Sequence, residues 1–208
     1  MGEVLTPEGT LQQSSLAIDL QGKTYGCIMA DPPWHFRSWS AKGTGRSAEQ
    51  HYAVMNLEDI KSLDVSAIAA RDACLFLWAV DCMLPEALET MAAWGFTFKT
   101  VAFDWIKQTT NGKWHIGLGY WTRMGSERVL LGTRGKPKPL SHAVRQVVIA
   151  KRREHSRKPD EVRGRIEQLV AGPRLELFAR EAAIGWDSWG NEVGKWKSNL
   201  LTETSPCA

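Results

Sequence analysis

The stretch whose residue types most clearly suggest a chemical role is IMADPPWHF, residues 28–36, in which a short apolar run ends at Asp31. Pro32 and Pro33 follow, and a proline holds its backbone angle φ near about −65° and has no N–H donor. The segment therefore offers a carboxylate and proline carbonyls, all hydrogen-bond acceptors, beside the flat face of Trp34. A planar ring that carries an amino group, such as a nucleobase, could donate hydrogen bonds to these acceptors and stack on the indole ring. The structural alternative is an ordinary Asp-Pro turn in front of a core tryptophan.

The elements that must position this segment alternate between strands and helices. Apolar, β-rich runs predict strands over residues 25–30, 73–79, 97–107, 127–133, 144–150 and 174–179. Capping residues and helical spacing predict helices over 56–63, 84–95 and 158–170. The continuous apolar run 73–79 is typical of a buried parallel strand.

This alternation predicts an α/β fold, a sheet with helices on both faces. In such sheets ligands bind beyond the carboxyl ends of the strands. Asp31 and Arg180 each follow a predicted strand, so we expect both at that edge. The length of 208 residues suits one domain. We expect it to cover 23–195, with an N-terminal arm over 1–22 and a C-terminal tail over 196–208.

Several classes of protein do not fit this composition. The N-terminal segment lacks the basic start and apolar core of a signal peptide. Apolar runs fall short of the roughly 20 residues that span a bilayer. The cysteines fit no zinc-ligand spacing, so we expect no metal site and free thiols in a reducing cytoplasm. They are Cys27, Cys74, Cys82 and Cys207.

Positive charge is concentrated in one segment. Residues 134–158 hold nine Lys and Arg against one acid, a net charge of +8, whereas the rest of the chain has 17 against 22, a net charge of −5. A basic segment on a mildly acidic body favours a polyanionic partner such as nucleic acid. The alternative is a solvated basic loop.

Several further motifs follow IMADPPW in a fixed order: HYAVM, LFLW, WIK, GLGYWTRMGSERVLLG, SRKPDE, LELFAR and GWDSWGNEV. Together with YGCIMADPPW they resemble the MT-A70 family of S-adenosylmethionine-dependent N6-adenine methyltransferases, over about residues 25–193. The resemblance implies a Rossmann-like methyltransferase sheet and S-adenosylmethionine as cofactor. It also implies a permuted order, in which the catalytic DPPW precedes the cofactor strand LELFAR. A G-x-G-x-x-G fingerprint is absent from the sequence.

The resemblance also assigns roles to individual residues. The implied catalytic motif is Asp31, Pro32, Pro33 and Trp34. The implied cofactor-binding residues are Asp31, Pro32, Ser156, Lys158, Arg180, Asn191 and Glu192. Among these, Lys158 would meet the cofactor carboxylate, and Asn191 and Glu192 the ribose hydroxyls. The implied substrate-binding residues are Trp34, Tyr52, Lys107, Trp121 and Glu127.

Three of these neighbourhoods have simpler explanations. Lys158 could be one more lysine of the basic segment, and Asn191 a turn residue after Gly190. Trp78 ends a buried run and is expected in the core. The segment REAAIGW, residues 180–186, departs from the family pattern, so Ala182 and Ala183 are poor contact candidates.

The expected function is methylation of the N6 amino group of adenine in DNA, on an extruded or unpaired base. DNA is favoured because compact family members resemble bacterial and phage enzymes, which implies a cytoplasmic protein of a bacterium or a phage-infected cell. The alternatives are N6 methylation of adenosine in RNA, methylation of another amino group, and a non-catalytic nucleic-acid-binding subunit. A homodimer is a possible assembly, and no membrane partner is expected.

Overall fold

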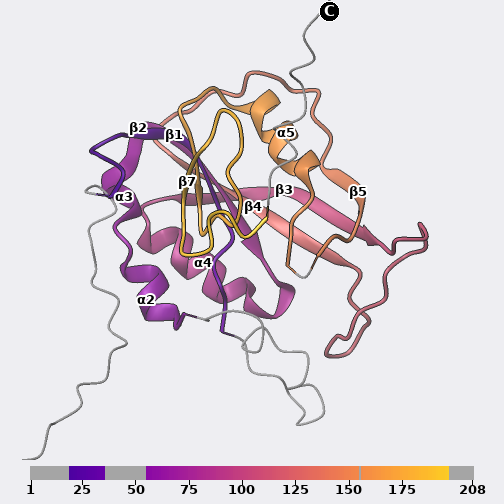
Figure 1. The fold of residues 1–208 in the computed structure, drawn as a ribbon. Helices are drawn as coiled ribbons and strands as arrows, with labels where there is room; N and C mark the ends of the chain where they lie inside the picture. The colour runs from indigo at the N-terminus through magenta and orange to yellow at the C-terminus, as the bar shows by residue number, and fades with distance from the viewer. Residues whose placement is uncertain (1–18, 36–54, 155, 197–208) are drawn as a thin grey trace, which may run out of the picture.

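The computed structural model describes residues 19–35, 55–154 and 156–196. Seven strands form one sheet in the order β5-β3-β4-β2-β1-β6-β7 (Figure 1). The elements in chain order are β1 (Tyr25–Ala30), α2 (Leu57–Ser62), α3 (Val65–Ile68), β2 (Ala69–Ala79), the 3-10 helix η3 (Asp81–Met83), α4 (Leu84–Ala93), β3 (Thr97–Gln108), β4 (Ser126–Arg134), β5 (Val147–Lys151), α5 (Asp160–Leu169), β6 (Arg174–Leu177) and β7 (Asp187–Trp189).

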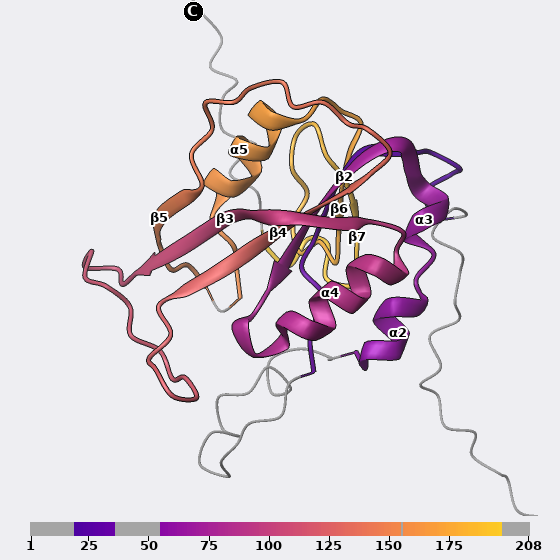
Figure 2. The same cartoon turned by 180° about the vertical axis from the view of Figure 1, so that it is seen from behind.

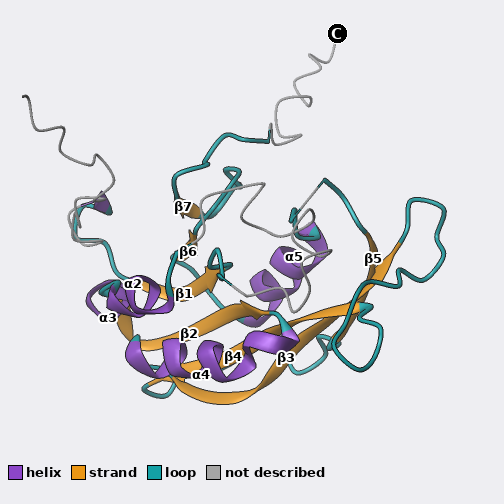
Figure 3. Cartoon of the chain, turned by 90° about the horizontal axis from the view of Figure 1, so that it is seen from below, coloured by secondary structure: helices purple, strands orange, loops and turns teal. Residues whose placement is uncertain are grey.

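The sheet is mixed. β1 runs parallel to both β2 and β6, and β7 is parallel to β6. β4 is antiparallel to β2 and to β3, and β3 is parallel to β5. The run 73–79 was predicted to be a buried parallel strand. That prediction is correct for one neighbour only, since β2 is parallel to β1 and antiparallel to β4. Figure 3 shows β5 and β7 at opposite ends of the sheet.

The three predicted helices form where their start and stop signals lie. Asn56 caps α2, since its side-chain oxygen accepts a hydrogen bond from the backbone N–H of Asp59 at 2.8 Å. Pro85 lies in the first turn of α4. Gly95 follows that helix with a positive φ of 80°, a conformation that glycine adopts without strain. Pro159 precedes α5, which tolerates the missing N–H at that position.

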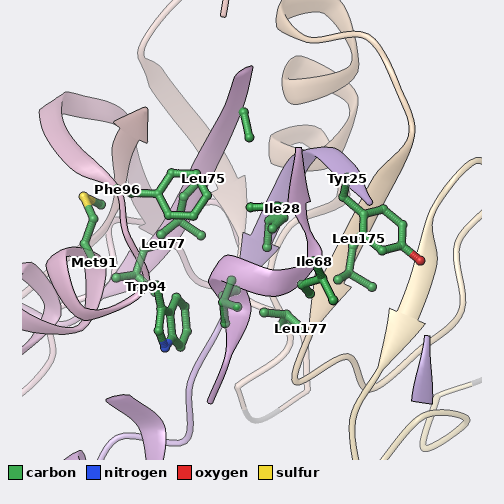
Figure 4. Packing of buried hydrophobic residues seen from close by; sticks show 14 of the residues in the cluster. Tyr25, Ile28, Ile68, Leu75, Leu77, Met91, Trp94, Phe96, Leu175 and Leu177 are labelled. Carbon is green, nitrogen blue, oxygen red and sulfur yellow. The ribbon is translucent and has the colours of Figure 1, made fainter. Parts of the chain in front are cut away.

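Side chains of the central strands alternate between two cores. One core packs Ile28, Leu75 and Leu77 against α2, α3 and α4, and includes Trp94 and Phe96 (Figure 4). In the second core the side chains on the opposite face of the same strands pack against α5, and Met29, Phe76 and Trp78 are among its members. The predicted helices on both faces are thus confirmed, with α5 on the face away from α4 (Figures 2 and 3).

Some elements differ from the sequence predictions. β6 ends at Leu177, because Phe178 adopts a left-handed φ of 60°, so the strand is shorter than 174–179. β2 begins four residues earlier than the apolar run, and β5 begins at Val147. The short elements α3, η3 and β7 lack the length that makes a periodic pattern visible.

Two cysteines are buried on neighbouring strands, Cys27 on β1 and Cys74 on β2, and both are free. Burial raises the pKa of the Cys74 thiol to about 11. Among the described residues, no helix is long and apolar enough to span a membrane. The boundaries of the arm and the tail stay predictions.

Candidate active site

One row of side chains crosses the sheet on the face that carries α5. Lys107 on β3 and Glu127 on β4 are each two residues from a member of the α5 core, Trp105 and Val129 respectively. Their side chains therefore lie on the same face of the sheet as that core. Trp78 on β2 belongs to that core as well. The row brings these three side chains toward the end of β1, where the next residue is Asp31.

Asp31 forms an ion pair with Lys158, whose Nζ lies 3.0 Å from Oδ2. Lys158 stands immediately before Pro159 and the start of α5, so the helix fixes its approach to the strand end. The two side chains are 21% and 22% exposed, which leaves the pair partly accessible. The ammonium group also lies 5.1 Å from the ring centroid of Trp78. Trp78, expected in the core, is buried and also forms part of the site.

Glu127 joins this pair to Lys107. Its Oε2 lies 3.2 Å from Nζ of Lys158, and its Oε1 accepts a short hydrogen bond from Nζ of Lys107. Burial alone would raise the pKa of Glu127, but the ammonium groups of Lys158 and Lys107 outweigh it and lower the pKa to about 2. Burial likewise opposes the charge on Lys158, yet Asp31 and Glu127 raise its pKa above the usual range. Glu127 and Lys158 therefore both carry their charge at neutral pH.

A hollow opens beside Asp31, between the carboxyl ends of β1 and β6 and the start of α5. Four residues that the sequence assigned to the cofactor line it together: Asp31, Ser156, Lys158 and Arg180. Aromatic side chains add apolar walls, namely Trp78, Phe178 and Trp196. This position agrees with the general rule that places ligands beyond the carboxyl ends of parallel strands.

A second charged cluster lines the same hollow and was missed by the sequence reasoning. Glu176 on β6 pairs with Nη2 of Arg163 at 2.9 Å. Glu181 is buried and pairs with Nη2 of Arg157 at 2.6 Å. Burial raises the pKa of Glu176, and the guanidinium of Arg163 offsets this only in part. The available signal was an acid within the apolar strand RLELFA, at a position that faces α5.

The other assigned cofactor residues lie beside the hollow. Nε of Arg180 is 3.2 Å from a carboxylate oxygen of Glu192, which also pairs with Lys195. Arg180 further approaches the Trp196 ring, 5.8 Å from its centroid. Asn191 lies in an exposed turn, as the simpler explanation proposed. Its role toward ribose stays a prediction, as does that of Glu192.

The prolines and the tryptophan of DPPW form hydrogen bonds with neighbouring parts of the chain. Trp34 is 5% exposed, and its indole N–H donates to the carbonyl oxygen of Trp78 at 3.1 Å. The Pro32 carbonyl accepts from the backbone N–H of Trp34 at 2.8 Å. The Pro33 carbonyl accepts from the backbone N–H of Met55 at 3.1 Å. Each carbonyl thus has one partner already, and Asp31 is the acceptor of this motif that faces the hollow.

The assigned substrate-binding residues lie in different surroundings. Lys107 and Glu127 belong to the charged cluster on the α5 face, whereas Trp34 is buried in the core that packs against α2, α3 and α4. Trp121 lies on the segment between β3 and β4, with 89% of its surface exposed. Tyr52 lies outside the described residues. The structure therefore brings two of the five to the ion pair of Asp31.

The basic segment 134–158 divides into two groups. Four of its cations form internal pairs or contacts, with Arg134 at the far end of β4 and the other three around the start of α5: Arg134, Arg153, Arg157 and Lys158. The other five side chains are exposed: Lys136, Lys138, Arg145, Lys151 and Arg152. Only the exposed group remains suited to bind phosphates.

Comparison with known proteins identifies the family. The MT-A70 family model matches residues 25–192. The chain is 33% identical to the Type II methyltransferase M.MunI of Mycoplasma sp, over 88% of this chain and 84% of that protein. It is 32% identical to the N(6)-adenosine-methyltransferase MT-A70-like protein of Arabidopsis thaliana, and 29% identical to the N(6)-adenosine-methyltransferase catalytic subunit METTL3 of Homo sapiens. Each of these matches covers 86% of this chain, but only 25% and 30% of the relatives' own lengths. The chain belongs to the MT-A70 family.

Proposed function

We propose that this protein transfers a methyl group from S-adenosylmethionine to the N6 amino group of adenine in DNA. The observation that carries this function is the Asp31 carboxylate, held by Lys158 at the rim of the hollow between β1 and β6. Membership of the MT-A70 family supports the adenine amino group as the acceptor. It also supports S-adenosylmethionine, which supplies an electrophilic methyl group on a sulfonium centre.

The hollow suits the parts of this cofactor. The cationic side chains of Lys158 and Arg180 complement a carboxylate, and the polar side chain of Ser156 can bond an amino or carboxylate group. The aromatic walls Phe178 and Trp196 suit a nucleoside ring. These residues would hold the cofactor against the end of β1.

The main task of the protein in this reaction is positioning. The amino nitrogen of adenine is a weak nucleophile because its lone pair is delocalised into the ring. Asp31 would accept a hydrogen bond from the amino group, which favours a tetrahedral nitrogen whose lone pair can face the methyl group. Lys158 fixes the direction of that carboxylate, and Glu127 fixes Lys158 in turn. Such preorganised electrostatics is commonly the largest part of enzymatic rate enhancement.

The acceptor base must leave the base stack before it reaches Asp31. A base inside a duplex is inaccessible, so the enzyme acts on an extruded or an unpaired adenine. Lys151 and Arg152, the exposed cations beside Gln108 at the end of β3, would bind the flanking phosphates. The buried hydrogen bond between Trp34 and Trp78 would keep the DPPW backbone fixed while the base enters.

The choice of DNA depends on the relatives. The Type II methyltransferase matches over most of both lengths, whereas the N(6)-adenosine-methyltransferases match over less than a third of theirs. We therefore infer DNA, with adenosine in RNA as the second candidate. A non-catalytic binding subunit fits less well, because Asp31, Lys158 and Arg180 are all present and converge on the hollow.

Methyl transfer to matched oligonucleotides tests this function. The purified chain is incubated with S-adenosylmethionine labelled in the methyl group and with single- and double-stranded DNA and RNA of one sequence. We expect DNA to acquire more label than RNA of the same strandedness. Preference for RNA would support the second candidate. Cofactor binding measured by calorimetry, with no transfer to any substrate, would support a binding subunit.

A further inference from the structure

The segment between β3 and β4, residues 109–125, forms an arm that projects beyond the ends of these strands (Figures 1 and 2). It carries the most exposed aromatic side chains of the described structure. Trp121 is 89% exposed, Tyr120 73% and Trp114 60%. Ile116 and Leu118 are exposed on the same arm. Large aromatic side chains in such a position indicate a binding surface.

The backbone of the arm is held in a defined shape. The N–H of Gly117 donates to the carbonyl of Met124 at 2.6 Å, which joins the two legs. A Cβ on Gly117 would lie 3.0 Å from that same carbonyl oxygen, and one on Gly119 would collide with the carbonyl of Thr122. The legs therefore approach as closely as they do because these positions are glycine. The aromatic rings are presented by a closely packed hairpin.

The base of the arm is the charged cluster of the active site. The backbone N–H of Lys107 donates to Gly125, and the backbone carbonyl of Lys107 accepts from His115, both at 2.9 Å. The side chain of Lys107 pairs with Glu127, which pairs with Lys158 beside Asp31. Nucleic acid that follows the arm to its base would therefore reach the charged cluster beside the proposed acceptor site.

The charge of the arm points to a polyanion. The 17 residues of the arm include Lys113 and Arg123 and no Asp or Glu. A guanidinium nitrogen of Arg152, within the basic segment, lies 3.2 Å from Nδ1 of His115. Exposed aromatic rings set among cations are suited to stacking on bases while the cations meet phosphates.

We propose that this arm opens double-stranded DNA beside the target adenine by stacking Tyr120 and Trp121 on bases that lose their neighbours. This role rests on the proposed methyl transfer to adenine. Removing a base from the stack exposes the faces of the adjacent bases, and an aromatic ring in contact with such a face offsets the lost stacking. The rings of Tyr120 and Trp121 stand nearly perpendicular, with an interplanar angle of 83°, so they offer faces in two directions.

A fluorescent base separates this role from the methyl-transfer chemistry. Duplex DNA carries 2-aminopurine beside the target adenine, and its fluorescence rises when stacking is lost. The double variant Tyr120→Ser/Trp121→Ser is compared with Ile116→Ser/Leu118→Ser, which removes exposed apolar area from the same arm without removing an aromatic ring. We expect the wild type and the aliphatic variant to increase the fluorescence, and the aromatic variant to lose at least about five-sixths of that increase.

Transfer rates provide the second readout. We expect the ratio of duplex to single-strand transfer to fall at least about tenfold in the aromatic variant and less than about threefold in the aliphatic one. Equal losses in both variants, or no fluorescence rise with the wild type, would overturn the role. So would a change from dimer to monomer in the aromatic variant by light scattering, since the arm would then be a protein interface. If the wild type transfers no methyl group to any substrate, the proposed function fails, yet the fluorescence still decides the role of the arm.

Discussion

The ammonium group of Lys158 lies 3.0 Å from a carboxylate oxygen of Asp31, and this pair links the start of α5 to the end of β1. The same ammonium is 3.2 Å from Glu127 on β4. One cation thus fixes two carboxylates that come from separate strands. The direction of the Asp31 carboxylate consequently depends on residues more than 90 positions away in the chain.

Glu127→Gln tests the positioning role directly. Glu127 does not line the hollow but pairs with Lys158, which in turn holds Asp31, so the change is expected to act on Asp31 through Lys158. We expect the turnover number to fall roughly 10- to 100-fold, because misplacement of a catalytic group by about 1 Å can cost that much. The dissociation constant of the cofactor, measured by calorimetry, should change less than about threefold. The control is Glu89→Gln, which removes a carboxylate that pairs with Lys61 on the surface and should leave turnover unchanged.

The low pKa of Glu127 predicts a specific pH dependence of stability. A carboxyl with a pKa of about 2 in the folded chain and roughly 4.3 when unfolded stabilises the fold above pH 4.3. That contribution is lost as the pH falls from 4.3 toward 2. Chemical unfolding at pH 7 should show Glu127→Gln to be less stable by on the order of 2–3 kcal/mol, and the difference should shrink at pH 3. A difference that is equal or larger at pH 3 would contradict the assignment of the charged pairs.

Trp34→Phe separates anchoring from stacking. The change keeps an aromatic face but removes the indole N–H, which leaves the buried carbonyl of Trp78 without its donor. We expect a loss of about 1–3 kcal/mol in the free energy of unfolding. The matched change Trp121→Phe, on a side chain that is 89% exposed, should alter stability by less than about 0.5 kcal/mol. Equal effects of the two changes would show that the Trp34 hydrogen bond contributes little.

Two glycines, one in a crowded and one in an open position, allow a matched test of side-chain packing. A Cβ on Gly132 of β4 would lie 2.6 Å from Sδ of Met91 and 3.1 Å from Cβ of Phe96, both in the core. Gly132→Ala should therefore destabilise the fold by about 1–3 kcal/mol through overpacking. Gly164 in α5 has open space around the same position, and Gly164→Ala should stabilise by about 1 kcal/mol, since alanine favours a helix. Thermal unfolding that ranks the two variants in the opposite order would show that β4 and α4 pack differently.

Local signals made much of the fold predictable. The cap at Asn56, the proline and glycine that flank α4, and the apolar run of β2 each act within a few residues, and each predicted element is present. The antiparallel pairing of β4 with β2 was not predictable, because pairing depends on contacts between residues about 55 positions apart. The boundary of β6 was missed because the backbone of Phe178 turns left-handed, which its residue type does not indicate.

Which residues belong to the site could be predicted from the sequence, but which of them pair with one another could not. Resemblance indicated Asp31 and Lys158 as separate residues of a catalytic motif and a cofactor site. Their ion pair, and the link through Glu127 to Lys107, arise only when the fold brings the end of β1 and the start of α5 to the face of β3 and β4 that carries Lys107 and Glu127. Glu176 was overlooked because a single acid in an apolar strand gives no hint of Arg163 as its partner.

The most direct test of the central claim is the identity of the methylated nucleoside. Duplex DNA is incubated with the enzyme and S-adenosylmethionine deuterated in the methyl group, then digested and analysed by mass spectrometry, for the wild type and for Asp31→Asn. Deuterated N6-methyladenine from the wild type, reduced at least about 100-fold in the variant, is the predicted result, because Asp31→Asn removes the carboxylate that would orient the amino group. Label on another base, or equal label with both proteins, would contradict methyl transfer to adenine through Asp31.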